Sequence, residues 1–382
     1  MTTKSPAFME AFRRLVATPS VSCLDPALDQ SNRPVVDLLA EWLECLGFGI
    51  RIMPVGETGK VNMIARTGGG EGGLVLSGHT DTVPFNREQW DQDPFTLTEK
   101  DGRCYGLGAS DMKCFFAIVL DVLEDLDLGA LRQPLCVLAT CDEESNMSGA
   151  KALVDAGVTL GRHALIGEPT GLQPIRMHKG VLFESIRLVG RSGHSSDPGM
   201  GVNALEGMNA VINGLTDWRG ELQAGNSDAD FKVPVPTLNF GSIRGGDNPN
   251  RICANCEMTM DVRLLPHMDI EETRAALRRV VMKSIDGSGL QVEFDCIFPG
   301  TPGMRTDGSA EIVRVAERLS GRRAGTVAFG TEGPYLNALG METVVLGPGD
   351  IAQAHQANEY VALDRLDPMR DIVHGMIRHF CK

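Results

Sequence analysis

The sequence predicts an α/β protein in which a smaller α+β domain interrupts a larger one. Three observations predict this fold class. The chain has 382 residues, whereas a domain usually holds about 100–200, so we expect two domains. Short apolar runs that end in polar or glycine-rich clusters indicate buried parallel strands in the first and last parts of the chain. A stretch of regular apolar–polar alternation in between indicates a different, half-solvated sheet.

The outer parts of the chain predict an open, mostly parallel sheet covered by helices. Four apolar runs lead directly into polar or glycine-rich clusters, at residues 74–76, 135–139, 164–166 and 343–346. Between them lie apolar residues at helical spacing, for example Phe115, Ile118 and Val122. Ligands of open α/β sheets bind beyond the carboxyl ends of the strands, so we expect the polar clusters to line one crevice.

The beginning of the chain predicts an amphipathic helix. Within residues 1–20, the apolar side chains Phe8, Phe12, Leu15 and Val16 fall at helical spacing, unlike the continuous apolar core of a secretion signal. The ten cysteines have no framework spacing, which favours reduced thiols. We therefore expect a cytoplasmic protein.

The middle of the chain predicts a ferredoxin-like domain. Residues 251–264 alternate so that one strand face is apolar and the other, with Arg251 and Arg263, is solvated. The same alternation would direct Cys253 and Cys256 to opposite faces, so they could not easily chelate one ion. The expected order β-α-β-β-α-β comes from strands near 183–189, 237–243, 251–264 and 290–296 and helices near 202–215 and 270–281. We place this domain at 181–297, with the first domain formed by 1–180 and 298–382.

The charge balance narrows the classes of partner. The sequence has 36 Lys and Arg against 50 Asp and Glu, a formal net charge of −14. Nucleic-acid binding and docking on an anionic membrane both need basic surface, so we expect neither. A small cationic substrate is compatible with an acidic chain, although net charge bears on solubility first.

The polar clusters contain the residue types of a metal-dependent hydrolase. Each residue has an ordinary structural alternative, such as a helix cap for Asp111, a solvated corner for Glu143 and Glu144, or a plain loop residue for His355. Together, however, nitrogen and oxygen donors at one sheet edge suit a pair of zinc or cobalt ions, and Asp111 is the candidate bridge. One of the two adjacent glutamates could bind metal while its neighbour serves as a general base. The candidates are His79, Asp81, Asp111, Glu143, Glu144, Glu168 and His355.

Five motifs, taken together, resemble a known family. They are Ser77-Gly78-His79-Thr80-Asp81, Gly106-Leu107-Gly108-Ala109-Ser110-Asp111-Met112-Lys113, Asp142-Glu143-Glu144, Gly167-Glu168-Pro169-Thr170 and Ser192-Gly193-His194-Ser195-Ser196. In this order they resemble the dinuclear zinc deacylase and peptidase family, which includes deacetylases, desuccinylases and aminoacylases. The resemblance covers essentially the whole chain. The strings 250–254 and 346–356 are most similar to the branch that deacetylates acetylornithine.

The resemblance implies a role for each motif residue. His79 and Glu168 would bind one zinc ion, Glu144 and His355 the other, and Asp111 would bridge them. Asp81 would orient His79, and Glu143 would be the general base. His194 would come from the partner subunit of a homodimer, formed through the inserted lid domain, and would stabilise the oxyanion. The sequence departs from the family at Cys114, where glycine is common, so either tighter packing or a thiol near the site is expected there.

The function implied is hydrolysis of N2-acetyl-L-ornithine to L-ornithine and acetate in arginine biosynthesis. Asn250, Arg251 and Arg263 are candidates for binding the substrate carboxylate, although a solvated strand edge explains both arginines equally well. Glu332 is the candidate partner of the substrate's side-chain ammonium. The alternatives are a related amidohydrolase acting on succinyl-diaminopimelate, N-acetylcitrulline or a dipeptide, and a catalytically silent binding protein of the same fold.

Overall fold

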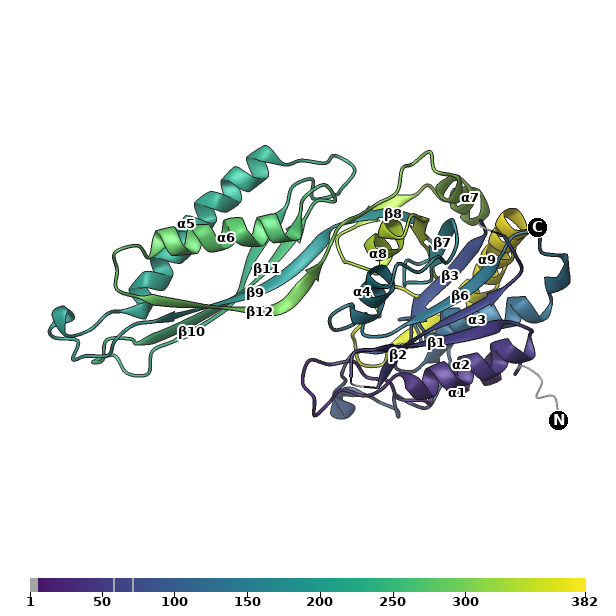
Figure 1. Ribbon diagram of the computed structural model, residues 1–382. Helices are drawn as coiled ribbons and strands as arrows, with labels where there is room; N and C mark the ends of the chain where they lie inside the picture. Colours follow the sequence, from purple (N-terminus) through teal and green to yellow (C-terminus); the bar gives the residue numbers. More distant parts are fainter. Residues whose placement is uncertain (1–5, 58, 71) are drawn as a thin grey trace. The chain divides into compact units, whose positions relative to one another are not determined.

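A computed structural model describes residues 6–57, 59–70 and 72–382. They form two compact units, shown with their helices and strands in Figure 1. The second unit comprises Met177–Met304 and Thr326–Gly330, and the first unit comprises the described residues up to Arg176 with Arg305–Gly325 and Thr331–Lys382. The second unit extends beyond the expected 181–297 because its two long strands, Gly180–Val189 and Gln291–Thr301, continue past those limits.

The first unit is built on a sheet whose centre is parallel. Nine strands of the described residues pair in the order β1-β2-β6-β3-β7-β15-β8-β13, with β14 paired to β8. The central four, β6, β3, β7 and β15, are parallel to one another, β1 and β2 are antiparallel to their neighbours, and β8 is antiparallel to β15. The bounds are β1 Gly49–Val55, β2 Lys60–Thr67, β3 Leu74–His79, β6 Leu135–Thr140, β7 His163–Ile166, β8 Ile175–His178, β13 Met304–Arg305, β14 Gly325–Val327 and β15 Glu342–Val345.

Helices cover both faces of this sheet. Gly78 of β3 lies against Met112 and Phe116 at the start of one helix, whereas its neighbour Ser77 bonds Glu332 just before another. Successive strand residues point to opposite faces, so these helices lie on opposite sides. The bounds are α1 Phe8–Val16, α2 Arg33–Cys45, α3 Lys113–Glu124, α4 Ser148–Asp155, α7 Glu311–Ser320, α8 Gly333–Ala338 and α9 Leu366–Cys381.

The N-terminal helix has the predicted amphipathic form. In α1 the side chains of Phe8, Phe12, Leu15 and Val16 are buried in the main core, which also contains most of α3 and α9. The first five residues of the expected segment lie outside the described part of the chain. Within the described residues, no helix is long and apolar enough to cross a membrane.

Short elements complete the first unit. Residues 98–105 and 360–362 form a small antiparallel sheet with the strand order β16-β5-β4. Its strands are β4 Thr98–Lys100, β5 Arg103–Tyr105 and β16 Tyr360–Ala362. The described residues also form the 3-10 turns η1 Arg87–Gln89, η2 Leu128–Ala130, η3 Pro198–Met200 and η4 Leu363–Arg365, of which η3 belongs to the second unit.

The second unit has the predicted ferredoxin-like order. Its antiparallel sheet runs β10-β11-β9-β12, and two helices pack together over its apolar face (Figure 1). In β11 the residues Cys256, Met258, Met260, Val262 and Leu264 are buried, which confirms the alternation predicted there. The elements in chain order are β9 Gly180–Val189, α5 Ala204–Gly225, β10 Thr237–Gly245, β11 Asn255–Leu264, α6 Ile270–Ser284 and β12 Gln291–Thr301.

The beginning of β11 differs from the prediction. The strand starts at Asn255, so Arg251 lies outside it and does not share a strand face with Arg263. The expectation that Cys253 and Cys256 face opposite ways was also wrong, because both are buried in the same core. The chain irregularity at Arg251–Ala254 breaks the period of two on which both expectations depended.

Candidate metal centre

The predicted ligands gather at the carboxyl ends of the central strands. His79 is the last residue of β3, Glu143 follows β6, and Glu168 follows β7. His355 lies in the loop after β15, and Asp111 immediately precedes α3 in the connection from β5. Because the central strands are parallel, these ends meet at one edge of the sheet, as expected for an α/β fold.

Asp111 lies between two histidines. Its Oδ1 atom is 2.9 Å from His79 Nε2, and its Oδ2 atom is 3.7 Å from His355 Nε2. Glu144 Oε2 lies 2.9 Å from the same His355 nitrogen, and Glu168 Oε1 lies 3.8 Å from His79 Nε2. Asp111 therefore presents one oxygen to the His79–Glu168 pair and the other to the His355–Glu144 pair.

Among the residues that the structure describes, two sets of side chains are close enough to hold a metal ion. His79, Glu143 and Glu168 offer donor atoms within 4.8 Å of one another, and so do His79, Asp111 and Glu144. Imidazole nitrogens and carboxylate oxygens are donors that divalent ions accept in proteins. The cluster is thus a candidate metal site, and Glu143 lies inside it beside the predicted ligands.

A backbone carbonyl, not only a side chain, orients His79. His79 Nδ1 lies 3.0 Å from the Asp81 carbonyl oxygen but 3.8 Å from Asp81 Oδ1. If Nδ1–H donates to this carbonyl, Nε2 is left with its lone pair facing Asp111, the form that a metal ligand needs. The Asp81 side chain accepts the Glu144 backbone N–H at 3.1 Å. Asp81 therefore links His79 to the turn that carries Glu144.

The cluster holds more negative charge than its protein partners balance. Burial, and then the charge of Asp111, raises the pKa of Glu168 well above its ordinary value. Burial and the charge of Glu168 do the same to the pKa of Glu143. A hydrogen bond to Glu144 raises the pKa of His355 to about 9. These shifts show that the cluster attracts positive charge, whether protons or metal ions.

One buried oxygen of the cluster lacks a hydrogen bond. Glu168 Oε1 has no hydrogen-bond partner within the described part of the chain, and its ion-pair contact with His79 Nε2 is 3.8 Å long. Leaving a buried carboxylate oxygen without a partner is costly, whereas coordination of a divalent ion would use it. The donor set and this oxygen therefore fit the metal that the sequence motifs imply.

Comparison with known proteins decides the family. The model of peptidase family M20/M25/M40 matches residues 75–379, which include every predicted metal ligand. The chain belongs to peptidase family M20/M25/M40. An acetylornithine deacetylase of Proteus mirabilis is 47% identical over 384 residues, covering 100% of this chain and 98% of that protein.

Solved structures of M20 proteins share the fold. A metallo-carboxypeptidase of the M20 family from Sulfolobus solfataricus is 17% identical, with a TM-score of 0.77 over 98% of this chain and 99% of that chain. A Bacillus subtilis protein, described as a dinuclear metal binding peptidase of the M20 family, is also 17% identical, with a TM-score of 0.66 over 97% and 96%. These likenesses confirm the α/β fold with a separate antiparallel unit.

His194 is an exposed loop residue of the second unit. The Ser196 backbone N–H donates to His194 Nδ1 at 3.2 Å, and the Ser196 hydroxyl is 2.7 Å from the same atom. An Nδ1 that accepts the backbone N–H leaves the proton of the neutral imidazole on Nε2. His194 is therefore held as a donor through Nε2, although its predicted role stays a prediction.

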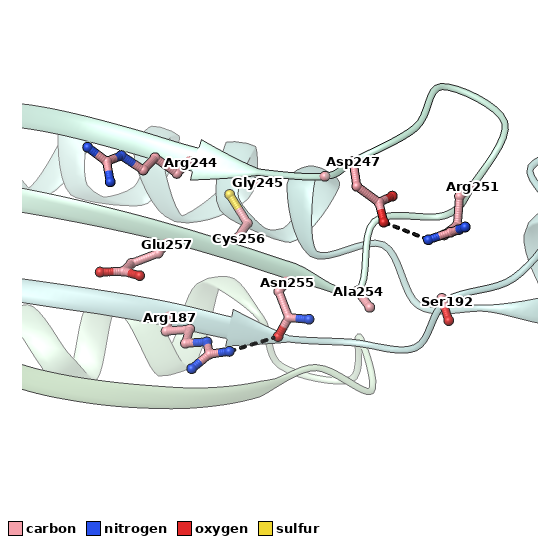
Figure 2. Close-up of a pocket in the computed structure, with 11 residues that line it drawn as sticks. Arg187, Ser192, Arg244, Gly245, Asp247, Arg251, Ala254, Asn255, Cys256 and Glu257 are labelled. Carbon is pink, nitrogen blue, oxygen red and sulfur yellow. Dashed lines mark hydrogen bonds and ion pairs between the residues drawn. The ribbon is translucent and has the colours of Figure 1, made fainter.

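The predicted carboxylate-binding residues are spread along the second unit. Arg251 lines a recess of about 600 Å³ with Arg187 and Arg244, where it pairs with Asp247 (Figure 2). Arg263 instead pairs with Asp261, at 2.8 Å. The stretch of β11 from Asn255 to Arg263 alone spans about 26 Å, at about 3.3 Å a residue. Arg251 and Arg263 of one chain therefore cannot hold the same small carboxylate. Asn250 lies beside Arg251, and its carbonyl oxygen accepts the Ser195 N–H at 3.1 Å.

Burial bears on two further residues singled out from the sequence, Glu332 and Cys114, and for Cys114 it favours the packing alternative. Glu332 is only 1% exposed, and its two oxygens accept the hydroxyls of Ser77 and Thr140. A carboxylate that is buried and bonded in this way is not free to contact a substrate ammonium. Its two hydrogen bonds link β3 to β6 instead. Cys114 is fully buried in the core of the first unit, and burial raises the pKa of its thiol far above the ordinary value. It is a packing residue, not a thiol of the site.

The structure adds two buried groups that sequence reasoning missed. Lys60 forms ion pairs at 2.7 Å with Asp29 and with Asp142, the residue before Glu143. Glu359 accepts backbone N–H groups from the loop that ends at Asp111. Neither lies in a distinctive motif, and their partners are distant in sequence, so no local signal marks them.

Proposed function

We propose that this chain hydrolyses N2-acetyl-L-ornithine to L-ornithine and acetate, in arginine biosynthesis and in the cytoplasm, with two divalent metal ions, zinc or cobalt. The observation that carries the chemistry is Asp111 between two histidine–glutamate pairs. The observation that favours this substrate is the 47% identity, over the full chain, to a protein named acetylornithine deacetylase.

The metal ions have an assigned set of ligands in this proposal. His79 and Glu168 would hold one ion, Glu144 and His355 the other, and Asp111 both. Two such ions polarise an acyl carbonyl and lower the pKa of a water molecule. The Nδ1 contact of His79 and the N–H bond from Glu144 to Asp81 keep the ligands in place.

Glu143 is the proposed general base. It lies in the cluster next to Glu144, within 4.8 Å of the donor atoms of His79 and Glu168. Glu143 takes a proton from the attacking water and passes it to the departing amine nitrogen of ornithine. In the metal-free cluster, burial and the charge of Glu168 raise the pKa of Glu143, and bound cations would offset that charge so that the carboxylate can accept the proton.

His194 is the proposed oxyanion donor. Its Nε2–H, fixed by the Ser196 N–H bond at Nδ1, would stabilise the negative charge that develops on the acyl oxygen. In the proposal this histidine is supplied by the partner subunit of a homodimer formed through the second unit. Asn250 with either Arg251 or Arg263, but not with both arginines of one chain, would bind the substrate carboxylate.

A substrate panel tests the proposal. The purified chain, stripped of metal and then reloaded with zinc or cobalt, is assayed with acetylornithine, succinyl-diaminopimelate, N-acetylcitrulline and a dipeptide, with bound metal measured by elemental analysis. We expect acetylornithine to have the highest kcat/KM, by about tenfold or more, and activity to require metal. Preference for another amide would overturn the substrate. Absence of both metal and hydrolysis would favour the silent binding protein.

A further inference from the structure

The loop that carries Asp111 directs its backbone N–H groups at one buried side chain. The Gly108 N–H donates to Glu359 Oε2 at 2.9 Å, and those of Ser110 and Asp111 donate to Oε1 at 2.7 and 3.0 Å. The Glu359 carbonyl oxygen also accepts the Gly106 N–H, at 3.0 Å. Glu359 is buried, with only 2% of its surface exposed. Four backbone N–H groups of this loop therefore donate to one buried residue.

We propose that Glu359 is a positioning residue, which holds this loop so that the two oxygens of Asp111 face His79 and His355. The inference rests on the proposed function, because the role of Glu359 is measured through the binding of the metal ions that Asp111 would bridge. In this role Glu359 is not itself a metal ligand. It acts through the backbone of Ser110 and Asp111, and therefore through the place at which the Asp111 side chain begins.

The chemistry of these hydrogen bonds favours a carboxylate. In its ionised form, Glu359 offers two negatively charged oxygens to three N–H groups, and such charge-assisted bonds are about twice as strong as neutral ones. Glutamine at the same place would keep one oxygen acceptor. Its NH2 group, however, would face one of the N–H donors and leave that donor buried without a partner.

The position of Glu359 in the chain couples both sides of Asp111. His355, four residues earlier, lies 2.9 Å from Glu144 and 3.7 Å from Asp111 at their closest paired atoms. Immediately after Glu359, β16 pairs with β5 through Tyr360 and Tyr105, and β5 leads into the loop at Gly106. One short segment thus supplies a proposed ligand and anchors the loop of the proposed bridge.

Metal titration of variants tests this role without any substrate. We would compare the wild-type chain with Glu359→Gln, Glu359→Asp and the control Glu317→Gln. Glu317 is matched in chemistry, because its carboxylate accepts the Ala324 backbone N–H at 2.8 Å, but it lies on α7 and not on a ligand loop. The readouts are zinc affinity by chelator competition, the visible spectrum of the cobalt-loaded protein, the unfolding temperature, and kcat and KM separately.

The expected result is a loss of metal affinity that exceeds any loss of stability. Glu359→Gln should weaken the binding of at least one ion by about 10–100-fold, as outer-shell changes do, with an altered cobalt spectrum and a lower kcat at similar KM. Glu317→Gln should match the wild type. If Glu359→Gln does not fold, Glu359→Asp, which keeps the charge but shortens the reach, carries the same test.

Two results would overturn the positioning role. One is wild-type zinc affinity and cobalt spectrum in both Glu359 variants, and the other is an affinity loss no larger than that of Glu317→Gln. Failure of the proposed function would show in a different measurement, the release of ornithine by the wild-type chain. A wild-type chain that binds two ions but does not release ornithine from acetylornithine would overturn the substrate and leave the metal result for Glu359 intact.

Discussion

Replacement of Lys60 by methionine should destabilise the first unit and loosen the turn that carries Glu143. Lys60 is 2% exposed and forms ion pairs with Asp29 and Asp142, each at 2.7 Å. Burial lowers the pKa of Lys60, but hydrogen bonds to Asp142 and Asp29 outweigh it and raise that pKa. Methionine keeps the length and apolar stem of lysine and removes only the charge.

The magnitude follows from what remains around Asp142. Removing one partner of a buried ion pair costs about 3–5 kcal/mol, because the other charge is left uncompensated. Asp142 retains hydroxyl bonds from Ser22 at 2.8 Å and Ser148 at 2.7 Å, and the Asp29 side chain is 22% exposed. We therefore expect the lower end, a loss of about 3 kcal/mol in the free energy of unfolding.

Urea unfolding followed by circular dichroism measures this loss. The control is Lys100→Met, at an exposed position of β4, which should change the free energy of unfolding by no more than about 0.5 kcal/mol. Adding Asp142→Asn to Lys60→Met removes the unpaired charge and should recover part of the loss. Equal free energies of unfolding for Lys60→Met and Lys100→Met would refute the reasoning.

Two further predictions concern close packing and metal removal. At Gly349 an added Cβ would overlap the Ser110 carbonyl oxygen and lie 2.8 Å from Pro169 Cβ, so Gly349→Ala should cost about 1–3 kcal/mol of stability and weaken metal binding. Gly220→Ala, on α5 with nothing within 4 Å of the added Cβ, is the control and should not destabilise; a similar loss in both would contradict the packing argument. Removal of metal by a chelator should lower the unfolding temperature more at high pH than at low pH. Burial and the charge of Asp111 raise the pKa of Glu359 from 4.5 to about 8, and the hydrogen bond to Glu144 raises that of His355 from 6.5 to about 9. The metal-free folded state then holds more protons than the unfolded state across this range, so its stability falls as pH rises, while metal affinity grows as the ligands lose protons. Thermal unfolding at about pH 6 and about pH 9 measures the difference in unfolding temperature between the protein with and without chelator. A difference that becomes smaller toward high pH would contradict this account.

The sequence predicted those parts of the fold whose signal is local. The apolar runs that became β3, β6, β7 and β15 are buried on both faces, so a continuous run marks each of them. Parallel strands bring their carboxyl ends to one edge, and that rule alone placed His79 near the turn after β6. The ferredoxin-like order could be read from alternation and helical spacing in the same way.

The features of the fold and site that the sequence did not predict depend on contacts between residues far apart in the chain, which no local pattern encodes. Glu359 bonds the backbone of Asp111 from 248 residues away, and Lys60 reaches Asp142 across 82. The strands of the small β16-β5-β4 sheet are three residues each, too short for a period to be visible. Arg251 was misplaced because the apolar–polar pattern continues at residues 251–254, beyond the hydrogen-bonded strand.

The central claim, that Glu143 serves as general base beside a metal site that deacetylates acetylornithine, is tested most directly by Glu143→Ala. The measurement is ornithine release by the metal-loaded protein, with bound metal determined in the same samples. The variant should keep the wild-type metal content and fold, while its turnover falls by about 10²–10⁴-fold. Glu88→Ala, an exposed glutamate of η1, should turn over at the wild-type rate. Near-normal turnover of Glu143→Ala would contradict the claim.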